Sequence, residues 1–237
     1  MEGRQSGRVE AESEQAMVIL MPTTAPDDWR QFLAQPELHW ETGYSARTMA
    51  YAWEASGGVP PEVRGLLAQA LGPITPLVVI PERKTPLPGG RRESQSDAFL
   101  LARASTGLIA CTIEGKVSEP FGPTVAQQMV GASAGKKERL DYLCQRLGLK
   151  ACPDHVHYQL LHRSVAALIE ADLFAAQHAA MIVHSFSPER RWFDAFARFV
   201  ELLGGPTAEV GKAVVVPVEG RELVLGWACG EPRFREM

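Results

Sequence analysis

The segment from Ser96 to Val117, SDAFLLARASTGLIACTIEGKV, constrains the fold most strongly, because its two short apolar runs predict the strands of a β-hairpin. Residues Ala104–Gly107 provide a four-residue turn between the two runs. With this turn, the antiparallel register places Asp97 opposite Glu114. Three charged side chains, those of Asp97, Glu114 and Lys116, are therefore expected at the open end of an otherwise apolar hairpin.

The two faces of the second strand differ in chemistry. Alternate residues from Ile109 to Val117 are apolar and suit a core, whereas Glu114 and Lys116 project from the other face, on the side of Asp97. Opposed strand residues have Cβ atoms roughly 4.5 to 5.5 Å apart, and two like charges at that distance are destabilising unless a cation lies beside them. Two carboxylates beside a lysine suit a hard divalent ion such as Mg²⁺ or Mn²⁺.

Hydrophobic periodicity in the rest of the chain predicts an α/β domain on a mixed sheet that is flanked by helices. The predicted order is helix, three-strand meander, helices and strand, followed by a C-terminal hairpin. The expected elements are a helix over 42–58, a short helix over 62–71, a strand over 76–84, the hairpin, one helical turn within 118–137, helices over 136–147 and 157–174, a strand over 179–188, a helix over 189–205 and the closing hairpin over 212–230.

Asp97, followed after sixteen residues by Glu114-Gly115-Lys116 on an apolar strand, resembles the motif of the PD-(D/E)XK nuclease superfamily, which has the restriction-endonuclease-like fold. The core of that family is a helix, a three-stranded meander, a helix and a further strand, which is similar to the order predicted from Thr42 to Ser187. One position departs from the family pattern, because Ser96 stands where the family often has proline before the aspartate.

The resemblance implies roles for individual residues. Asp97 and Glu114 would be the metal-binding carboxylates and Lys116 the catalytic lysine, and Glu54 is the candidate for an acidic ligand from the first helix. The helix after the third strand of the family often carries a glutamine or basic residue that meets the substrate, and the loop before the hairpin supplies two arginines for phosphate contacts. The candidates for substrate binding are Gln159, His162, Arg163, Arg91 and Arg92.

These roles together predict a Mg²⁺-dependent phosphodiester hydrolase that acts on nucleic acid, with DNA favoured over RNA. Members of the family that cut duplex DNA often work as dimers, so the resemblance allows a homodimer. Two alternatives remain open. The first is a non-catalytic protein on the same fold that binds a partner, and the second is an unrelated α/β enzyme with a pocket around His162 and His184.

Composition sets broader limits on the protein. With 237 residues and 46% hydrophobic side chains, the chain is long enough for one large domain, which we expect over 16–237 after a disordered polar tail over 1–15. A formal charge of −4 gives no general attraction to nucleic acid, so a polyanion would need a local basic surface or a bound metal ion. No apolar run is long enough to span a membrane, so we expect a soluble protein.

Several motifs have a simpler interpretation. The four cysteines are dispersed without a C-x-x-C pair and the chain starts without a basic and apolar leader, which favours a reducing cytoplasm. A second E-x-K triplet, Glu82-Arg83-Lys84, follows a proline and has no aspartate on a preceding strand, so it carries no prediction. His184 is expected to be a hydrogen-bonded core histidine, and Trp192 part of the core stripe of the last helix. The alternative interpretation of Asp97, Glu114 and Lys116 is a surface ion pair at a strand end, with Asp97 as a turn residue.

Overall fold

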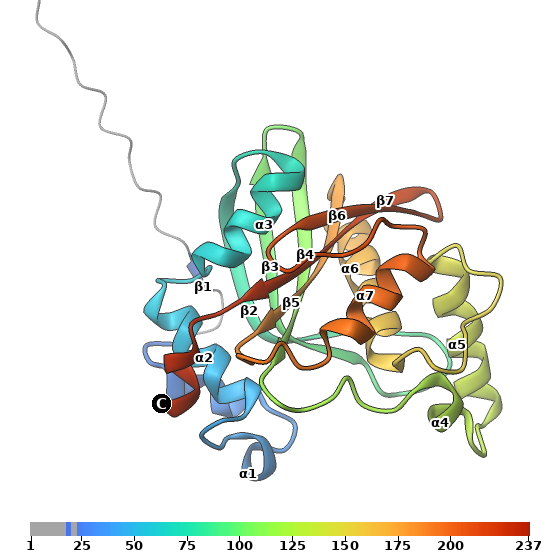
Figure 1. Cartoon of the computed structure of the whole chain (residues 1–237), viewed down its shortest axis with the longest axis horizontal. Helices are drawn as coiled ribbons and strands as arrows, with labels where there is room; N and C mark the ends of the chain where they lie inside the picture. Colours follow the sequence, from blue (N-terminus) through green and yellow to red (C-terminus); the bar gives the residue numbers. More distant parts are fainter. Residues whose placement is uncertain (1–17, 20–22) are drawn as a thin grey trace, which may run out of the picture.

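The protein is described by a computed structural model that covers residues 18–19 and 23–237. The tail predicted over 1–15 lies outside these residues. A single mixed sheet of seven strands runs through the described part of the chain, in the order β1-β2-β3-β4-β5-β7-β6 (Figure 1). The strands are β1 (Val18–Ile19), β2 (Thr75–Thr85), β3 (Ser94–Ala104), β4 (Gly107–Lys116), β5 (His178–Ser185), β6 (Ala213–Val218) and β7 (Arg221–Cys229).

The pairing of the central strands confirms the predicted hairpin and its register. Strands β2, β3 and β4 form an antiparallel meander, and Arg103 on β3 pairs with Leu108 on β4 across the expected turn. Strand β5 then adds parallel to β4, and β7 adds parallel to β5, while β6 pairs antiparallel with β7 in the predicted closing hairpin. Strands β2, β4 and β5 therefore end at the same edge of the sheet.

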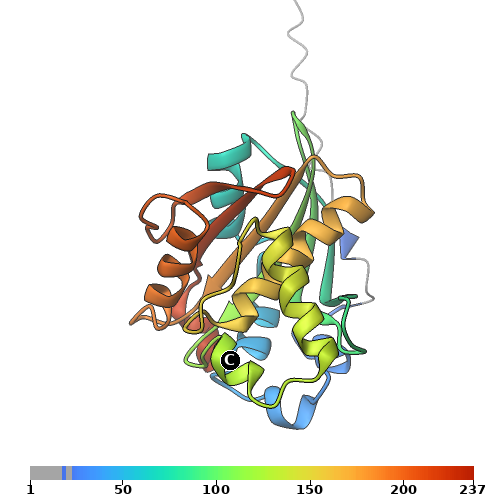
Figure 2. The ribbon, with the colours of Figure 1, turned by 90° about the vertical axis from the view of Figure 1, so that its right-hand side faces the viewer.

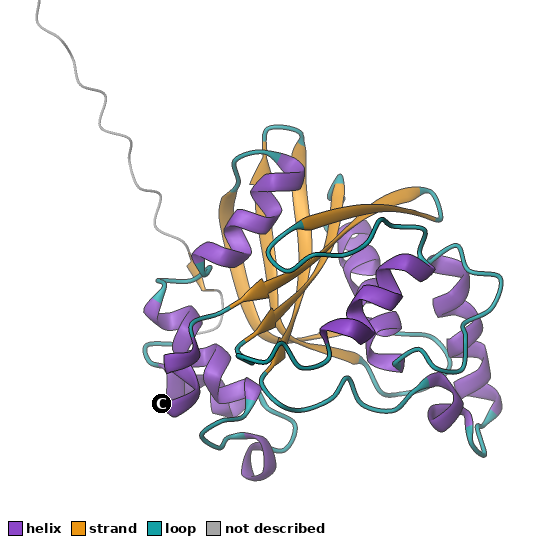
Figure 3. Ribbon diagram, viewed as in Figure 1, coloured by secondary structure: helices purple, strands orange, loops and turns teal. Residues whose placement is uncertain are grey.

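Helices cover both faces of the sheet, so the protein has the predicted α/β architecture (Figure 3). On one face, α2 (Ser45–Ala55) and α3 (Pro61–Leu71) bury Trp53 and Leu66. On the other face, α6 (Tyr158–Leu173) lies on β4 and β5, and α5 lies beside α6 (Figure 2). The remaining helices are η1 (Pro26–Phe32), α1 (Pro36–His39), α4 (Val125–Met129), α5 (Ala134–Arg146), α7 (Phe193–Leu202) and η2 (Pro232–Glu236).

The last helix begins later than predicted, and the prediction that Trp192 belongs to its core stripe is wrong. Trp192 precedes α7 with a left-handed backbone (φ 72°) and is 38% exposed, whereas Phe196 and Phe199 fill the core as expected. The indole of Trp192 instead donates a hydrogen bond to the Ser118 carbonyl. Helical periodicity continued through residue 192 in the sequence and gave no sign of this change of backbone.

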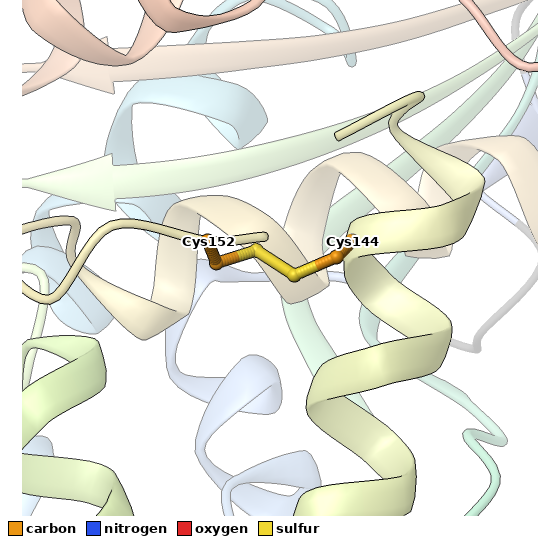
Figure 4. Close-up of a disulfide and its surroundings, with 2 residues drawn as sticks. All are labelled: Cys144 and Cys152. Atoms are coloured by element: carbon orange, nitrogen blue, oxygen red, sulfur yellow. A yellow bond between two sulfur atoms is a disulfide. The ribbon is translucent and has the colours of Figure 1, made fainter. Parts of the chain in front are cut away.

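Cys144 at the end of α5 forms a disulfide with Cys152, in the segment that leads to α6 (Figure 4). No sequence pattern predicts this pair, because the two cysteines are eight positions apart and form no common motif. Cys111 is buried and free, and Cys229 is exposed and free. No helix among the described residues has both the length and the apolar character needed to cross a membrane.

Candidate functional site

A cleft of about 590 Å³ opens at the edge of the sheet where β2, β4 and β5 end. Its walls come from α1, the start of α2, the loop before β3, the loop after β4 and the first turns of α6. Seven of the residues singled out from the sequence line this one cleft: Asp97, Glu114, Lys116, Arg92, Gln159, His162 and Arg163.

Glu114 and Lys116 form the floor of the cleft near the end of β4. Each is only 3% exposed. Lys116 Nζ donates to Glu114 Oε1 at 2.6 Å and to Gln159 Oε1 at 3.2 Å. Arg163 Nε donates to the other oxygen of Glu114 at 2.5 Å. A surface ion pair is therefore the wrong interpretation of Glu114 and Lys116, because both charges are buried and each is held by a partner from α6.

Asp97 lies next to these groups at the predicted position. The pair Ala98 and Ile113 continues the register, so Asp97 falls opposite Glu114, and its Oδ2 accepts a hydrogen bond from the Gly115 amide at 2.6 Å. A Cβ atom at Gly115 would lie 2.3 Å from the Met49 sulfur of α2. The glycine between Glu114 and Lys116 is thus required by close packing on the opposite face of the sheet.

Glu82 on β2 is a third carboxylate in the cleft, which the sequence analysis set aside. Its neighbours Pro81 and Arg83 pair with Ala98 and Ser96, so Glu82 falls opposite Asp97. The three acids of β2, β3 and β4 therefore form a row across adjacent strands. Glu82 has a left-handed backbone (φ 53°), and its Oε2 accepts from Gln95 at 2.8 Å. The loop of residues 86–93 between β2 and β3 is too long to fix their register from the sequence, so no local signal indicated Glu82.

The charges in this row determine how the acids ionise. Burial acts to raise the pKa of Glu114, but the adjacent Lys116 and Arg163 outweigh it and lower this pKa to about 2. Burial and the charge of Glu114 raise the pKa of Asp97 to about 7. Burial and the neighbouring Asp97 also raise the pKa of Glu82 well above its ordinary range. Glu114 is therefore fixed as an anion, Asp97 titrates near neutral pH, and the ionisation of Glu82 is opposed by its burial and by Asp97.

The first turns of α6 present the predicted substrate-binding residues to the floor. The backbone carbonyl of Arg163 accepts a hydrogen bond from Thr112 on β4, which fixes α6 against the strand. Ser94 Oγ lies 2.9 Å from both His162 Nδ1 and Arg163 Nη1. Burial and the charge of Arg163 lower the pKa of His162 well below its ordinary value, so this imidazole is neutral at pH 7.

Two predicted site residues lie elsewhere. Glu54 does not line the cleft, and its Oε1 accepts a hydrogen bond from the Trp29 indole at 2.7 Å. This position corrects its assignment as a metal ligand, because helix α2 turns its last residues away from the cleft and toward η1. Arg91 is exposed outside the cleft, although the adjacent Arg92 lines it.

The alternative pocket around His162 and His184 does not exist as one space. His184 lies on β5 beside Gly115, so it faces the sheet side opposite Glu114, and it is fully buried. Its Nδ1 accepts from the Trp53 indole at 3.2 Å, and its Nε2 lies 2.8 Å from Glu62 Oε1. His184 is therefore the hydrogen-bonded core histidine that the sequence predicted.

The donor set of the cleft suits Mg²⁺ better than a metal that needs a full protein cage. Among residues 18–19 and 23–237, no group of three or more histidine, cysteine or acidic side chains is arranged to hold an ion. Magnesium, however, is usually bound by one or two carboxylates together with water and substrate phosphate. Asp97 Oδ1 has no hydrogen-bond partner within the described chain and lines the cleft beside Glu114. Both oxygens of Glu114 accept hydrogen bonds from Lys116 and Arg163, so Asp97 is the acid of this pair with a free oxygen.

Comparison with known proteins gives a family without an assigned activity. The family model described as a domain of unknown function (DUF6946) matches residues 22–232. The chain belongs to this family. The match to the DUF6946 model includes the cleft and both helical layers. No curated protein and no solved structure matches the chain.

Proposed function

We propose that the protein is a Mg²⁺-dependent phosphodiester hydrolase that acts on nucleic acid and is a divergent member of the PD-(D/E)XK superfamily. One observation carries the proposal. Asp97, Glu114 and Lys116 come from two paired strands and line the floor of one cleft, next to Gln159 and Arg163 of the following helix. The pairing of β3 with β4 brings Asp97 close to Glu114 and Lys116, which lie more than fifteen positions away in the chain.

The order of the elements supports the same proposal. Helix α2, the meander of β2, β3 and β4, helix α6 and the parallel strand β5 follow the order of the core that the resemblance implies. The additional helices and the hairpin of β6 and β7 lie outside that core. The acids are found on the second and third strands of the meander, as the motif requires.

The proposed roles follow from charge and position. A divalent ion held by Asp97 and Glu114 would lower the pKa of a bound water and neutralise charge on the phosphoryl oxygens. Lys116 and Arg163 supply two fixed positive charges within reach of a phosphate that enters beside Glu114. Gln159 holds the Lys116 ammonium through its side-chain oxygen, which keeps this charge directed at the floor. Arg92 lies in the wall, where it can contact a flanking phosphate.

Cleavage assays with a matched control test the proposal. We expect Mg²⁺-dependent cleavage of at least one form of DNA, tested separately as plasmid and as labelled single-stranded oligonucleotide, and a loss of at least about 100-fold in Lys116→Ala. Lys84→Ala is the control, because Lys84 belongs to the other E-x-K triplet and is exposed outside the cleft, so its activity should equal that of the wild type. Equal activity of the Lys116 variant, or no cleavage by the wild type with Mg²⁺ or Mn²⁺, would overturn the hydrolase.

A non-catalytic binding protein is the second candidate, and one observation favours it. Both oxygens of Glu114 already accept hydrogen bonds from cationic side chains, so its charge is balanced without an ion. Calorimetric titration with Mn²⁺ separates the two candidates. The hydrolase requires measurable binding that Asp97→Ala abolishes, whereas the binding protein requires none.

We also retain a cytoplasmic location as part of the proposal. The redox state of Cys144 and Cys152 in cells tests this location, because the cysteines of cytosolic proteins are normally kept reduced. Alkylation in intact cells followed by mass spectrometry should find both thiols reduced. A pair that is oxidised in the cells would contradict this location.

A further inference from the structure

We propose that the cleft admits a single nucleic-acid strand and excludes an intact duplex. This inference rests on the proposed function and specifies its substrate. It follows from the depth of the acidic floor, from the way the walls are fastened, and from the exposed aromatic side chain at the opening.

The depth of the floor limits what can reach it. Glu114 and Lys116 are each 3% exposed, and Arg163 is 7% exposed. A cleft of about 590 Å³ has the size of a site for one small molecule. An intact duplex is wider than its major groove, which is itself about 12 Å across. It therefore cannot enter the cleft far enough to place an internal phosphate against these buried groups. A single extended strand can enter one nucleotide at a time.

Glu119, in the loop after β4, connects two segments that form one wall of the cleft. Its Oε1 accepts from the Ser45 amide at the start of α2 at 3.0 Å. Its Oε2 accepts from the amides of Val117 and Ser118 at 3.2 and 2.9 Å. One carboxylate thus joins α2 to the chain that leaves the floor, which keeps this side of the cleft from opening.

The opposite wall, formed by the loop between β2 and β3, is fastened to α5. Arg139 donates hydrogen bonds to the carbonyls of Pro88 and Leu87 at 2.8 and 3.3 Å. Gly89 and Gly135 pack backbone to backbone, because a Cβ atom at Gly89 would lie 2.1 Å from the Gly135 carbonyl oxygen. The two walls are therefore held by specific contacts at the separation that the structure shows.

The opening of the cleft carries an aromatic ring suited to an unpaired base. Tyr44 lines the cleft and is 46% exposed, beside the more exposed Leu38 of α1. Bases stack on exposed aromatic side chains when they are not paired, and such stacking tolerates any sequence. In a duplex the bases already stack on one another, so Tyr44 gains a partner only from a single strand.

The first test measures binding separately from cleavage. Fluorescence anisotropy with the wild-type protein in EDTA, which removes the divalent ion that the proposed cleavage needs and leaves every side chain of the cleft in place, compares a labelled single strand with a blunt duplex of the same sequence. We expect the single strand to bind at least tenfold more tightly, and Tyr44→Ala to weaken its binding about tenfold. Equal affinity for strand and duplex would overturn the inference, as would unchanged affinity in Tyr44→Ala.

The second test loosens a wall. Arg139→Ala removes the hydrogen bonds that hold the loop between β2 and β3, so we expect the preference for single strands in cleavage by the otherwise wild-type protein to fall at least threefold. Arg139 also lines the cleft, so Arg139→Lys, which keeps the positive charge but cannot make both hydrogen bonds, should show the same fall, whereas Lys136→Ala outside the cleft should show none. A preference that is unchanged in Arg139→Ala would contradict the role of the fastened wall.

Failure of this inference differs from failure of the proposed function. Cleavage of duplex and single strand at equal rates removes the inference and keeps the hydrolase. Selective binding of a single strand without cleavage keeps the inference and favours the non-catalytic protein. Neither binding nor cleavage of any nucleic acid removes both.

Discussion

Two buried polar clusters lie back to back on the sheet, and they are built on opposite principles. On one face, His184 connects the Trp53 indole to Glu62, and each ring nitrogen has one partner. On the other face, Glu82, Asp97 and Glu114 crowd three carboxylates against the two cations of the cleft floor. His184 on β5 pairs with Gly115 on β4, the residue after Glu114. Because successive residues of a strand point to opposite faces, His184 and Glu114 lie on opposite faces of the sheet.

The difference shows which cluster supports the fold and which is available for chemistry. In the histidine cluster the buried hydrogen-bonding groups have partners within the core. Removing a member of the cluster should therefore lower the stability of the fold, and His184 has no free ring nitrogen with which to bind a ligand. The cleft cluster opens to solvent, and the pKa values of two of its acids, Asp97 and Glu82, are raised because burial and neighbouring carboxylates oppose their ionisation. Acids with strongly shifted pKa values in a cleft are typical of functional sites.

The largest expected effect comes from the histidine cluster. Trp53 is fully buried, so Trp53→Ala should lower the free energy of unfolding by about 4 kcal/mol, through the cavity and the lost indole hydrogen bond. Urea denaturation measures this change, with Trp40→Ala as the control, because Trp40 is only half-buried. A loss below about 1 kcal/mol would mean that this cluster does not support the fold.

The cleft should respond in the opposite direction. Because Asp97 has a pKa of about 7 when folded and an ordinary value of 3.8, the folded protein binds more protons, and Asp97 lowers stability as pH rises from 4 to 7. Without divalent ions, Asp97→Asn should match the wild type near pH 4 and be more stable at pH 7 by up to about 4 kcal/mol. Thermal unfolding across this range checks the trend.

If the difference in stability between Asp97→Asn and the wild type does not grow with pH, the folded protein does not oppose the ionisation of Asp97. Adding Mg²⁺ should stabilise the wild type at pH 7 and leave Asp97→Asn unaffected, because an ion favours the ionised carboxylate. Stabilisation of both proteins by the same amount would place the ion elsewhere.

The smallest effect is expected at Glu62. Burial opposes its ionisation, but the hydrogen bond from His184 outweighs burial and lowers the pKa of Glu62 below its ordinary value of 4.5. The resulting stabilisation is present above pH 4.5 and is lost as pH falls below it. Glu62→Gln keeps an acceptor for His184, so it should cost less than about 1 kcal/mol at pH 7, and this cost should shrink as pH falls below 4.5. Equilibrium unfolding compares it with Glu41→Gln, which changes an exposed acid.

The part of the site that could be predicted from the sequence depends on local patterns. A turn of defined length and strict alternation were sufficient to place Asp97 opposite Glu114, and helical spacing placed Gln159 and Arg163 on one side of α6. These features involve residues close in the chain or on one paired strand, where geometry is fixed by period and register. The predicted architecture of the sheet follows from the same patterns.

The remaining features depend on contacts that no local pattern encodes. Glu82 joins the acids through the pairing of β2 with β3, and its left-handed backbone is atypical of a strand. Glu119 and Arg139 act on the cleft by bonding to backbone groups of distant segments, so their side chains carry no recognisable motif. Glu54 fails as a ligand because the 3-10 helix η1, absent from the predicted elements, supplies it with Trp29.

The glycine at position 115 has a consequence for how this family can diverge. It lets Met49 approach β4 from behind while its own amide holds Asp97 in front, so one residue without a side chain serves both layers. Replacing it would disturb the structure whether or not the acids still work. Relatives in which the acids are replaced should therefore still keep this glycine, because the packing of α2 on β4 needs it independently of the cleft.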